Sequence, residues 1–234
     1  MYIRPQWKWL GGLVVVALLA GCELGSGGDK PDAGNPAAAR SQVNFGAVGA
    51  SIANTPASAE ASLDMLAEYI RAQGHNDAER AYGVYRWVRD NIRSDDSILA
   101  GGAFDPASQT PGAVFSTRKA VCSGFAQLFV NLCQLAGVTA ETVMGYGVMS
   151  AYDPSIPVTS YNHLWCAVAV DGRWYLVEPS WPTSARLDGS SDPNFFFFTD
   201  PRAFAHRHLP YDEGWQLLDP PVSGDAFWGI LANE

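Results

Sequence analysis

The stretch Arg118-Lys119-Ala120-Val121-Cys122-Ser123-Gly124-Phe125-Ala126 decides the fold, because a polar, turn-prone segment here gives way to a strongly helical pattern. Residues 123–135 are predicted to form a buried central helix with a broad apolar face made of Phe125, Leu128, Phe129, Leu132 and Leu135. Cys122 then stands at the N-terminus of that helix, where the helix dipole and unpaired N–H groups favour thiolate over thiol. Because the thiolate is the reactive form, Cys122 is a candidate nucleophile.

A histidine and a carboxylate follow on two predicted strands. Residues 163–170 read as one strand, Asp171-Gly172 is a hairpin signal, and residues 173–177 read as the return strand. This pairing brings His163 close to Glu178. Cysteine, histidine and carboxylate in this chain order supply a nucleophile, a base and an orienting group.

The first residues have the pattern of a secretory signal. Arg4 and Lys8 precede an apolar run over residues 10–20, which is too short for a comfortable membrane span. The ending Leu19-Ala20-Gly21-Cys22 resembles the lipobox of bacterial lipoproteins. We therefore expect a signal peptide over residues 1–21 and a lipidated Cys22 as the membrane anchor; the alternative is an ordinary signal peptide with an incidental cysteine.

The rest of the chain divides by composition. Residues 22–57 are rich in Gly, Ala, Ser, Pro and Asn without an apolar period, so a flexible tether is expected there. Residues 58–234 are long enough for one well-cored domain. The formal net charge of −9 and the lack of a basic run argue against nucleic acid as a partner.

The remaining cysteines and histidines indicate neither a disulfide framework nor a metal centre. Cys122 and Cys133 are too far apart on one helix to bridge, and Cys133 with Cys166 read as small buried residues unless helix and strand face each other there. The segment His206-Arg207-His208 is interpreted as a solvated helix end. No metal and no cofactor are expected.

The order of predicted elements favours an α+β fold, with a central helix packed on an antiparallel sheet. Helices are expected over residues 58–73 and from a cap at Asp77, and a loop over residues 94–112. A strand over 139–149, loops over 151–160 and 182–193, a short strand over 195–198 and a short helix over 202–206, capped by Asp200, complete the set.

Three separated blocks resemble one family. The segment from Phe115 to Phe129 is similar to the nucleophile segment of the transglutaminase-like superfamily, and Asn162-His163-Leu164-Trp165 with Glu178-Pro179-Ser180-Trp181 resembles its histidine and carboxylate segments. The tail, Phe196-Phe197-Phe198-Thr199-Asp200-Pro201 with His208-Leu209-Pro210, resembles the kyphoscoliosis-peptidase branch. The resemblance implies a papain-like core with Cys122 as nucleophile, His163 as base and then acid, and the third position as orienter.

Three positions depart from the family pattern. Glu178 stands where Asp is usual, so its carboxylate lies one methylene further from the backbone. Cys166 stands where Asn is common, and Ser94 where Tyr is common. The nucleophile and the base are both retained.

The expected function is an envelope-anchored thiol enzyme acting on amide bonds of proteins or peptides, by hydrolysis or acyl transfer. Gln109, in the loop before the central helix, is a candidate side-chain donor to the oxyanion. Alternatives remain for each residue: Cys122 as a small buried group, His163 as a satisfied core histidine, Glu178 as a surface carboxylate at a strand end and Gln109 as a solvated loop residue. The competing function is a binding or scaffold module that keeps the fold without activity.

Overall fold

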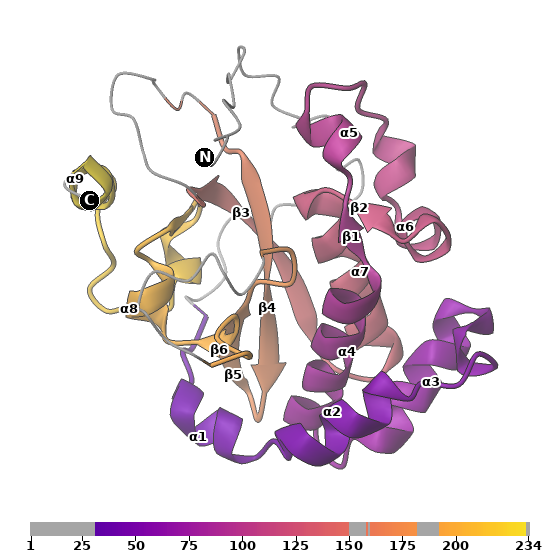
Figure 1. The fold of residues 1–234 in the computed structure, drawn as a ribbon. Coiled ribbons are helices and arrows are strands. Elements are labelled where there is room, and N and C mark those ends of the chain that lie inside the picture. The colour runs from indigo at the N-terminus through magenta and orange to yellow at the C-terminus, as the bar shows by residue number, and fades with distance from the viewer. Residues whose placement is uncertain (1–30, 150–157, 159, 182–191, 233–234) are drawn as a thin grey trace, which may run out of the picture.

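The computed structural model describes residues 31–149, 158, 160–181 and 192–232 (Figure 1). Among these residues the α-helices are α1 Pro36–Ser41, α2 Phe45–Ala53, α3 Leu63–Gln73, α4 Asp77–Asn91, α5 Asp96–Leu99, α6 Pro111–Thr117, α7 Cys122–Leu135, α8 Pro201–Phe204 and α9 Gly224–Ala232. The strands are β1 Arg93–Ser94, β2 Lys119–Ala120, β3 Ala140–Gly147, β4 His163–Val170, β5 Arg173–Val177, β6 Phe197–Thr199 and β7 His208–Pro210. No helix in this part of the chain combines the length and the apolar character that a membrane crossing requires.

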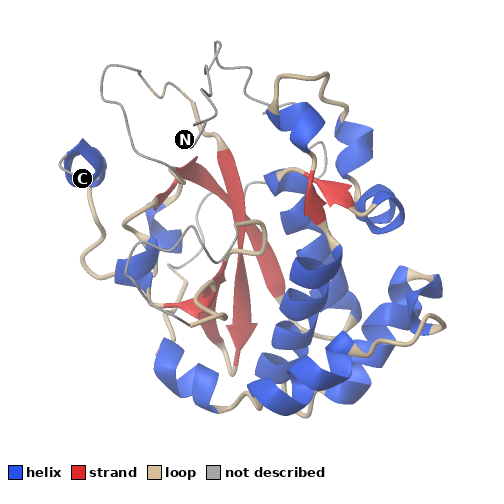
Figure 2. Cartoon of the chain, in the orientation of Figure 1, coloured by secondary structure: helices blue, strands red, loops and turns tan. Residues whose placement is uncertain are grey.

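One antiparallel sheet, in the order β6-β5-β4-β3-β7, forms the centre of the fold. Helices α3, α4 and α7 lie together on one side of it, and α8 lies on the other (Figure 2). The main apolar core lies between these three helices and the sheet, and a smaller one around Trp165 and Phe204 lies under α8. The expected α+β fold is confirmed.

The helix predicted from the cysteine segment is α7, and its apolar face is buried in the main core. Phe125, Leu128, Phe129 and Leu132 are all buried, as the helical period predicts, but Leu135, the last residue of the predicted face, is exposed at the end of the helix. Two features position the start of this helix. Arg118, with φ of 57°, turns the chain at the end of α6, and β2 then pairs in parallel with β1 immediately before Cys122.

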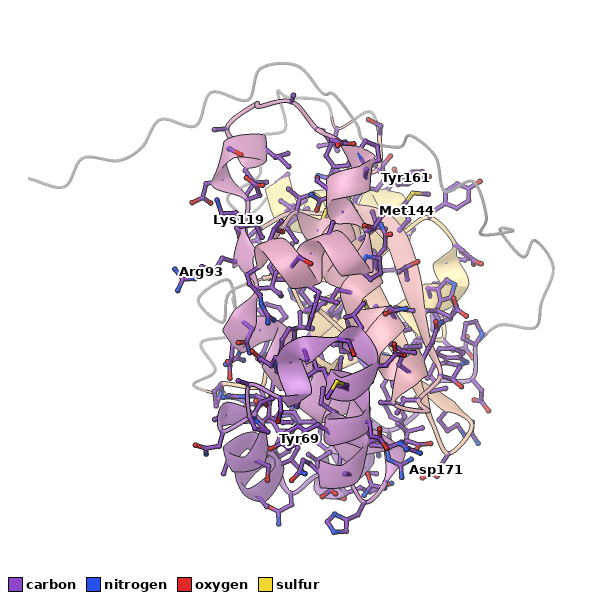
Figure 3. All side chains as sticks on the ribbon, turned by 90° about the vertical axis from the view of Figure 1, so that its right-hand side faces the viewer. Tyr69, Arg93, Lys119, Met144, Tyr161 and Asp171 are labelled. Carbon is purple, nitrogen blue, oxygen red and sulfur yellow. The ribbon has the colours of Figure 1, made fainter. Side chains whose placement is uncertain are left out.

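The predicted hairpin joins β4 to β5. Asp171 and Gly172 both have positive φ, 51° and 73°, which is what a two-residue type I′ turn requires. The register pairs Cys166 with Val177, so Glu178 follows directly at the end of β5. In Figure 3, Tyr161 and Asp171 lie at opposite ends of the sheet, and they flank β4 in the sequence. His163 therefore belongs to the end of β4 away from the hairpin turn.

The structure corrects the expected tether from residue 33 onward. Ala33 bridges Trp174 of β5, and α1 and α2 then pack on the domain with Ala39, Val48 and Ile52 buried in the main core. Phe45, Val48 and Ile52 follow a helical spacing that the composition of the segment obscured, and both helices are also capped. Asn35 accepts a hydrogen bond from Ala38 N, and Asn44 accepts one from Ala47 N. The expected signal peptide and the expected lipidation site, Cys22, lie outside the described residues.

Other boundaries differ more modestly. Asn76, and not Asp77, caps α4, because its side chain accepts from Glu79 N. The expected loop over residues 94–112 contains α5 and a 3₁₀ turn, Pro106–Gln109, before α6 begins at Pro111. The expected loops over 151–160 and 182–193 fall mostly on residues that are not described. Helix α8 is capped by Asp200, as predicted.

Candidate active site

Cys122 is the first residue of α7 and is partly exposed. The preceding residue, Val121, is extended and offers no side-chain cap, so the first turn of the helix keeps its N–H groups for other acceptors. Burial by itself raises the pKa of the Cys122 thiol, but a hydrogen bond to His163, the charge of that imidazole and the backbone of Leu164 outweigh burial. The net effect lowers the pKa of Cys122, which favours the thiolate.

His163 is the first residue of β4, and its ring is buried between Cys122 and Glu178. Its Nε2 lies 2.6 Å from Glu178 Oε2, so Nδ1 is the nitrogen left to face the thiol. Burial lowers the pKa of His163, but the charge of Glu178 and the hydrogen bonds to Cys122 and Glu178 raise it well above 6.5. The arrangement therefore favours an imidazolium beside a thiolate.

Glu178 is fully buried at 0% exposure, and its two oxygens have separate roles. Oε2 faces His163, while Oε1 accepts from Ser180 N at 2.7 Å, Ser180 Oγ at 2.6 Å and Trp181 N at 3.2 Å. The Glu-Pro-Ser-Trp segment thus folds back on its own carboxylate. Burial alone raises the pKa of Glu178, but the charge and hydrogen bonds of His163, followed by those of His208, lower it far below its ordinary value.

His208 also reaches Glu178, which corrects its assignment to a solvated helix end. It lies on β7, which pairs Gly147 with His208, and is 2% exposed. Its Nε2 is 3.2 Å from Glu178 Oε2, and its Nδ1 is 3.3 Å from Phe204 O. Sequence reasoning missed this contact because a three-residue strand carries almost no periodic signal. Pro210, which does not suit a continuing helix, was the one cue against a helical reading.

Gln109 is buried beside the start of α7, at 2% exposure, and is not a solvated loop residue. Its Oε1 accepts from Val121 N at 2.9 Å, and its Nε2 donates to Ser108 Oγ at 2.9 Å. Since Val121 N–H requires an oxygen, the orientation of the amide is fixed by its partners. The Nε2 group has two hydrogens, and the one that is not donated to Ser108 is available to another acceptor.

The two other described cysteines are core residues. Cys133 and Cys166 are free and buried, as their surroundings predict. Burial raises the pKa of both thiols well above its usual value, so neither competes with Cys122 as a nucleophile. Cys166 Sγ donates to Ala126 O at 3.7 Å, which links β4 to α7.

The described residues bring one set of metal-type donors together, namely His163, Glu178 and His208, with their ligand atoms within 4.8 Å of one another. The sequence indicated that His163 and Glu178 are close, but not that His208 joins them. All three side chains are buried, and both oxygens of Glu178 already accept hydrogen bonds. The contacts are those of a carboxylate shared by two imidazoles, and they match a hydrogen-bonded orienting group.

The chain is similar in sequence to several known proteins. Residues 64–179 match the transglutaminase-like superfamily model. Kyphoscoliosis peptidase of Homo sapiens is 34% identical over 172 residues, 70% of this chain and 26% of that protein. The Lim and transglutaminase domain protein ltd-1 of Caenorhabditis elegans is 26% identical over 181 residues, 70% of this chain and 24% of that protein. The chain thus spans about a quarter of these two relatives.

A solved structure is also similar in part. The periplasmic domain of TgpA from Pseudomonas aeruginosa is 17% identical, with a TM-score of 0.38, over 56% of this chain and 46% of that one. The segment matched by the superfamily model contains Cys122, His163 and Glu178, while His208 lies beyond it. The chain therefore carries a transglutaminase-like domain, with kyphoscoliosis peptidases among its relatives.

Proposed function

We propose that this protein is a thiol enzyme that acts on amide bonds of proteins or peptides through Cys122, His163 and Glu178. The observation that supports the proposal is the position of the His163 ring, whose Nε2 lies 2.6 Å from the buried Glu178 carboxylate and whose interaction with the Cys122 thiol lowers the pKa of that thiol. A core cysteine needs no such partner. The paired thiol and imidazole, with lowered and raised pKa values, are the arrangement that an acyl-transfer nucleophile requires.

The first half of the reaction forms a thioester. The Cys122 thiolate attacks the amide carbonyl carbon, and the negative charge moves to the carbonyl oxygen. His163 Nδ1 then gives its proton to the departing nitrogen, the C–N bond breaks and an amine leaves. The imidazole is now neutral, and Glu178 keeps its ring in place through Nε2.

The second half regenerates the thiol pair. Water or a second amine attacks the thioester carbonyl, and neutral His163 accepts the proton that the nucleophile loses. The C–S bond breaks and Cys122 leaves as a thiolate. Water as acceptor gives hydrolysis, and an amine gives transfer, so the two outcomes share every protein group.

The oxyanion is stabilised by the start of α7. Cys122 is the first residue of the helix, where N–H groups have no intrahelical acceptor and the dipole favours negative charge. Gln109 adds the Nε2 hydrogen not used by Ser108. Its second bond, from Val121 N to Oε1, ties this amide to the residue next to the nucleophile.

The cellular setting of the proposal is the bacterial envelope. Arg4, Lys8, the apolar run over residues 10–20 and the Leu19-Ala20-Gly21-Cys22 ending support export and lipidation of Cys22. Protein or peptide substrates in that compartment fit a domain with peptidases and transglutaminase-domain proteins among its relatives.

The test compares envelope peptides from cells that carry wild-type protein or Cys122→Ala. We expect peptides that are cleaved or cross-linked only with the wild type, identified by mass spectrometry. Cys133→Ala is the matched control, because it removes a buried thiol from the same helix and should keep the wild-type profile. Identical profiles for wild type and Cys122→Ala would instead support the scaffold function.

A further inference from the structure

His208 makes a second imidazole contact with the carboxylate that orients His163. Both Nε2 atoms meet the same oxygen, Glu178 Oε2, at 2.6 Å from His163 and 3.2 Å from His208. The centroids of the two rings lie 5.5 Å apart. Their strands, β4 and β7, are separated in the sheet by β3 alone.

The His208 ring is held in this direction by its neighbours. Phe204 stacks on it with centroids 3.9 Å apart and planes at 22°, and Trp181 lies 4.2 Å away at 35°. Trp165 meets it edge-on at 5.1 Å. With the ring fixed by packing and buried, its Nε2 stays directed at Glu178.

Glu178 has a specific need for a second donor at Oε2. Its side chain has one more rotatable bond than the aspartate for which it substitutes, so more positions are open to its carboxylate. Ser180 and Trp181 hold Oε1, but they make no contact with Oε2, which can still be displaced when the carboxylate pivots about Oε1. A donor from β7 in addition to the one from β4 fixes Oε2 from two directions.

The protonation of His208 suits this donor role. Burial lowers its pKa, the hydrogen bond and charge of Glu178 raise it, and the charge of His163 lowers it again, with a net pKa of about 4. His208 is thus neutral near pH 7 and carries one proton. A carboxylate is a stronger acceptor than the Phe204 carbonyl, so that proton belongs on Nε2.

We propose that His208 is a positioning residue of the active site, which holds Glu178 Oε2 against His163 and so maintains the reactive pairing of His163 with Cys122. The inference rests on the proposed thiol chemistry. It assigns no contact with substrate to His208, which acts through Glu178 alone. The closest substitute for its donor is glutamine, since the glutamine amide Nε2 can occupy the position of the imidazole Nε2.

The test is a mutant cycle read by alkylation of Cys122, which needs no substrate. Wild type, His208→Phe and His208→Gln are each made with Glu178 and with Glu178→Gln. The rate of iodoacetamide labelling is measured from pH 5 to pH 9, with the labelled peptide identified by mass spectrometry. The free energy of unfolding of all six proteins is measured in denaturant.

We expect His208→Phe, which keeps the stacked ring but has no donor, to slow labelling at pH 6 about tenfold, the usual effect of one hydrogen bond to a charged group. His208→Gln should restore most of the rate. In the Glu178→Gln background, His208→Phe should change the rate less than about twofold, because the carboxylate through which His208 acts is gone.

Equal slowing by His208→Phe in both backgrounds, or equal slowing by Gln and Phe, would overturn the inference and leave His208 a packing residue. Wild-type protein without labelling below pH 8 would be a different result, since it removes the thiolate pair and with it the proposed function. In that case, energetic coupling between residues 208 and 178 in the unfolding data would still support the contact, and its absence would reject it.

Discussion

Gly147 lies directly against the imidazole of His163. A Cβ atom at residue 147 would come within 2.7 Å of ring atoms Cγ and Cδ2, closer than side-chain carbons approach one another. Asn162 fixes the same glycine from the neighbouring strand, since its Oδ1 accepts from Gly147 N at 2.8 Å and its Nδ2 donates to Gly147 O at 3.1 Å. The His163 ring therefore packs directly on the backbone of a glycine.

Gly147→Ala should displace His163 and weaken its contact with Cys122. We expect iodoacetamide labelling of Cys122 at pH 6 to fall by about tenfold or more, because a misplaced base cannot hold the thiolate. Gly112→Ala is the control, because a Cβ there meets nothing within 4 Å. Labelling of the two variants at the same rate would mean that the ring adjusts without loss.

The thiolate itself gives a direct prediction. Because the pKa of Cys122 is lowered by His163, wild-type protein should be labelled well below pH 8. His163→Ala removes the charge and the hydrogen bond but not the burial, so labelling should begin only above pH 8.5. A pH profile of labelling checks this, and superimposable profiles for the two proteins would contradict the thiolate–imidazolium pair.

Gln109 should affect turnover and not thiolate formation. Loss of one oxyanion donor commonly lowers kcat about 100- to 1,000-fold, so Gln109→Ala should reduce cleavage of a peptide substrate by that order. Its labelling profile should stay close to wild type. Ser108→Ala, which removes a partner of the Gln109 amide but not the donor, should retain most activity. Parallel loss of labelling and turnover would point to a structural effect.

Stability should depend on pH through His208. Its pKa is about 4 in the fold against 6.5 when unfolded, so from pH 6.5 to pH 4.5 the unfolded chain binds the extra proton and acid destabilises the protein. His163, with a raised pKa, stays protonated in the fold, whereas the unfolded chain loses that proton as the pH rises through 6.5, so His163 partly opposes the His208 effect near neutral pH. Glu178, with a lowered pKa, adds a loss only below about pH 4.5. His163 and Glu178 are the two ionisable groups whose charges shift the pKa of His208.

We expect His208 to lower the free energy of unfolding by about 2 kcal/mol between pH 7 and pH 5, partly offset by His163 in the wild type. His208→Gln cannot titrate and should lose that difference. Denaturant unfolding of both proteins at pH 5, 6 and 7 measures it. The same slope in both proteins would show that residue 208 is not the group that titrates.

The side chains that the sequence placed correctly lie at the ends of long, regular elements. Cys122 stands at the start of a 14-residue helix with a clear apolar face, and His163 and Glu178 bracket a hairpin whose turn residues are diagnostic. The spacing of apolar residues indicates where a helix or strand begins, and the pairing of the two strands of a hairpin indicates which of their ends are adjacent. The α+β fold and the contact of His163 with Glu178 were predictable for that reason.

His208 and the N-terminal helices were missed because their structure depends on tertiary contacts. The three residues of β7 show no alternation that a reader of sequence can use, and its position follows from pairing with β3. Helix α2 carries Phe45, Val48 and Ile52 at helical spacing, and Asn35 before Pro36 and Asn44 were available as capping signals. Composition outweighed those local cues.

The packing of α1 and α2 determines where the chain can be shortened for production in a soluble form. Arg40 of α1 donates to the carbonyls of Asn194 and Phe197, and Val48 and Ile52 of α2 lie in the main core. A recombinant fragment starting at residue 58, the boundary that composition suggests, would leave that apolar surface open to solvent and prone to aggregate. A fragment starting near residue 31 keeps both helices and is the piece suited to purification and enzymology.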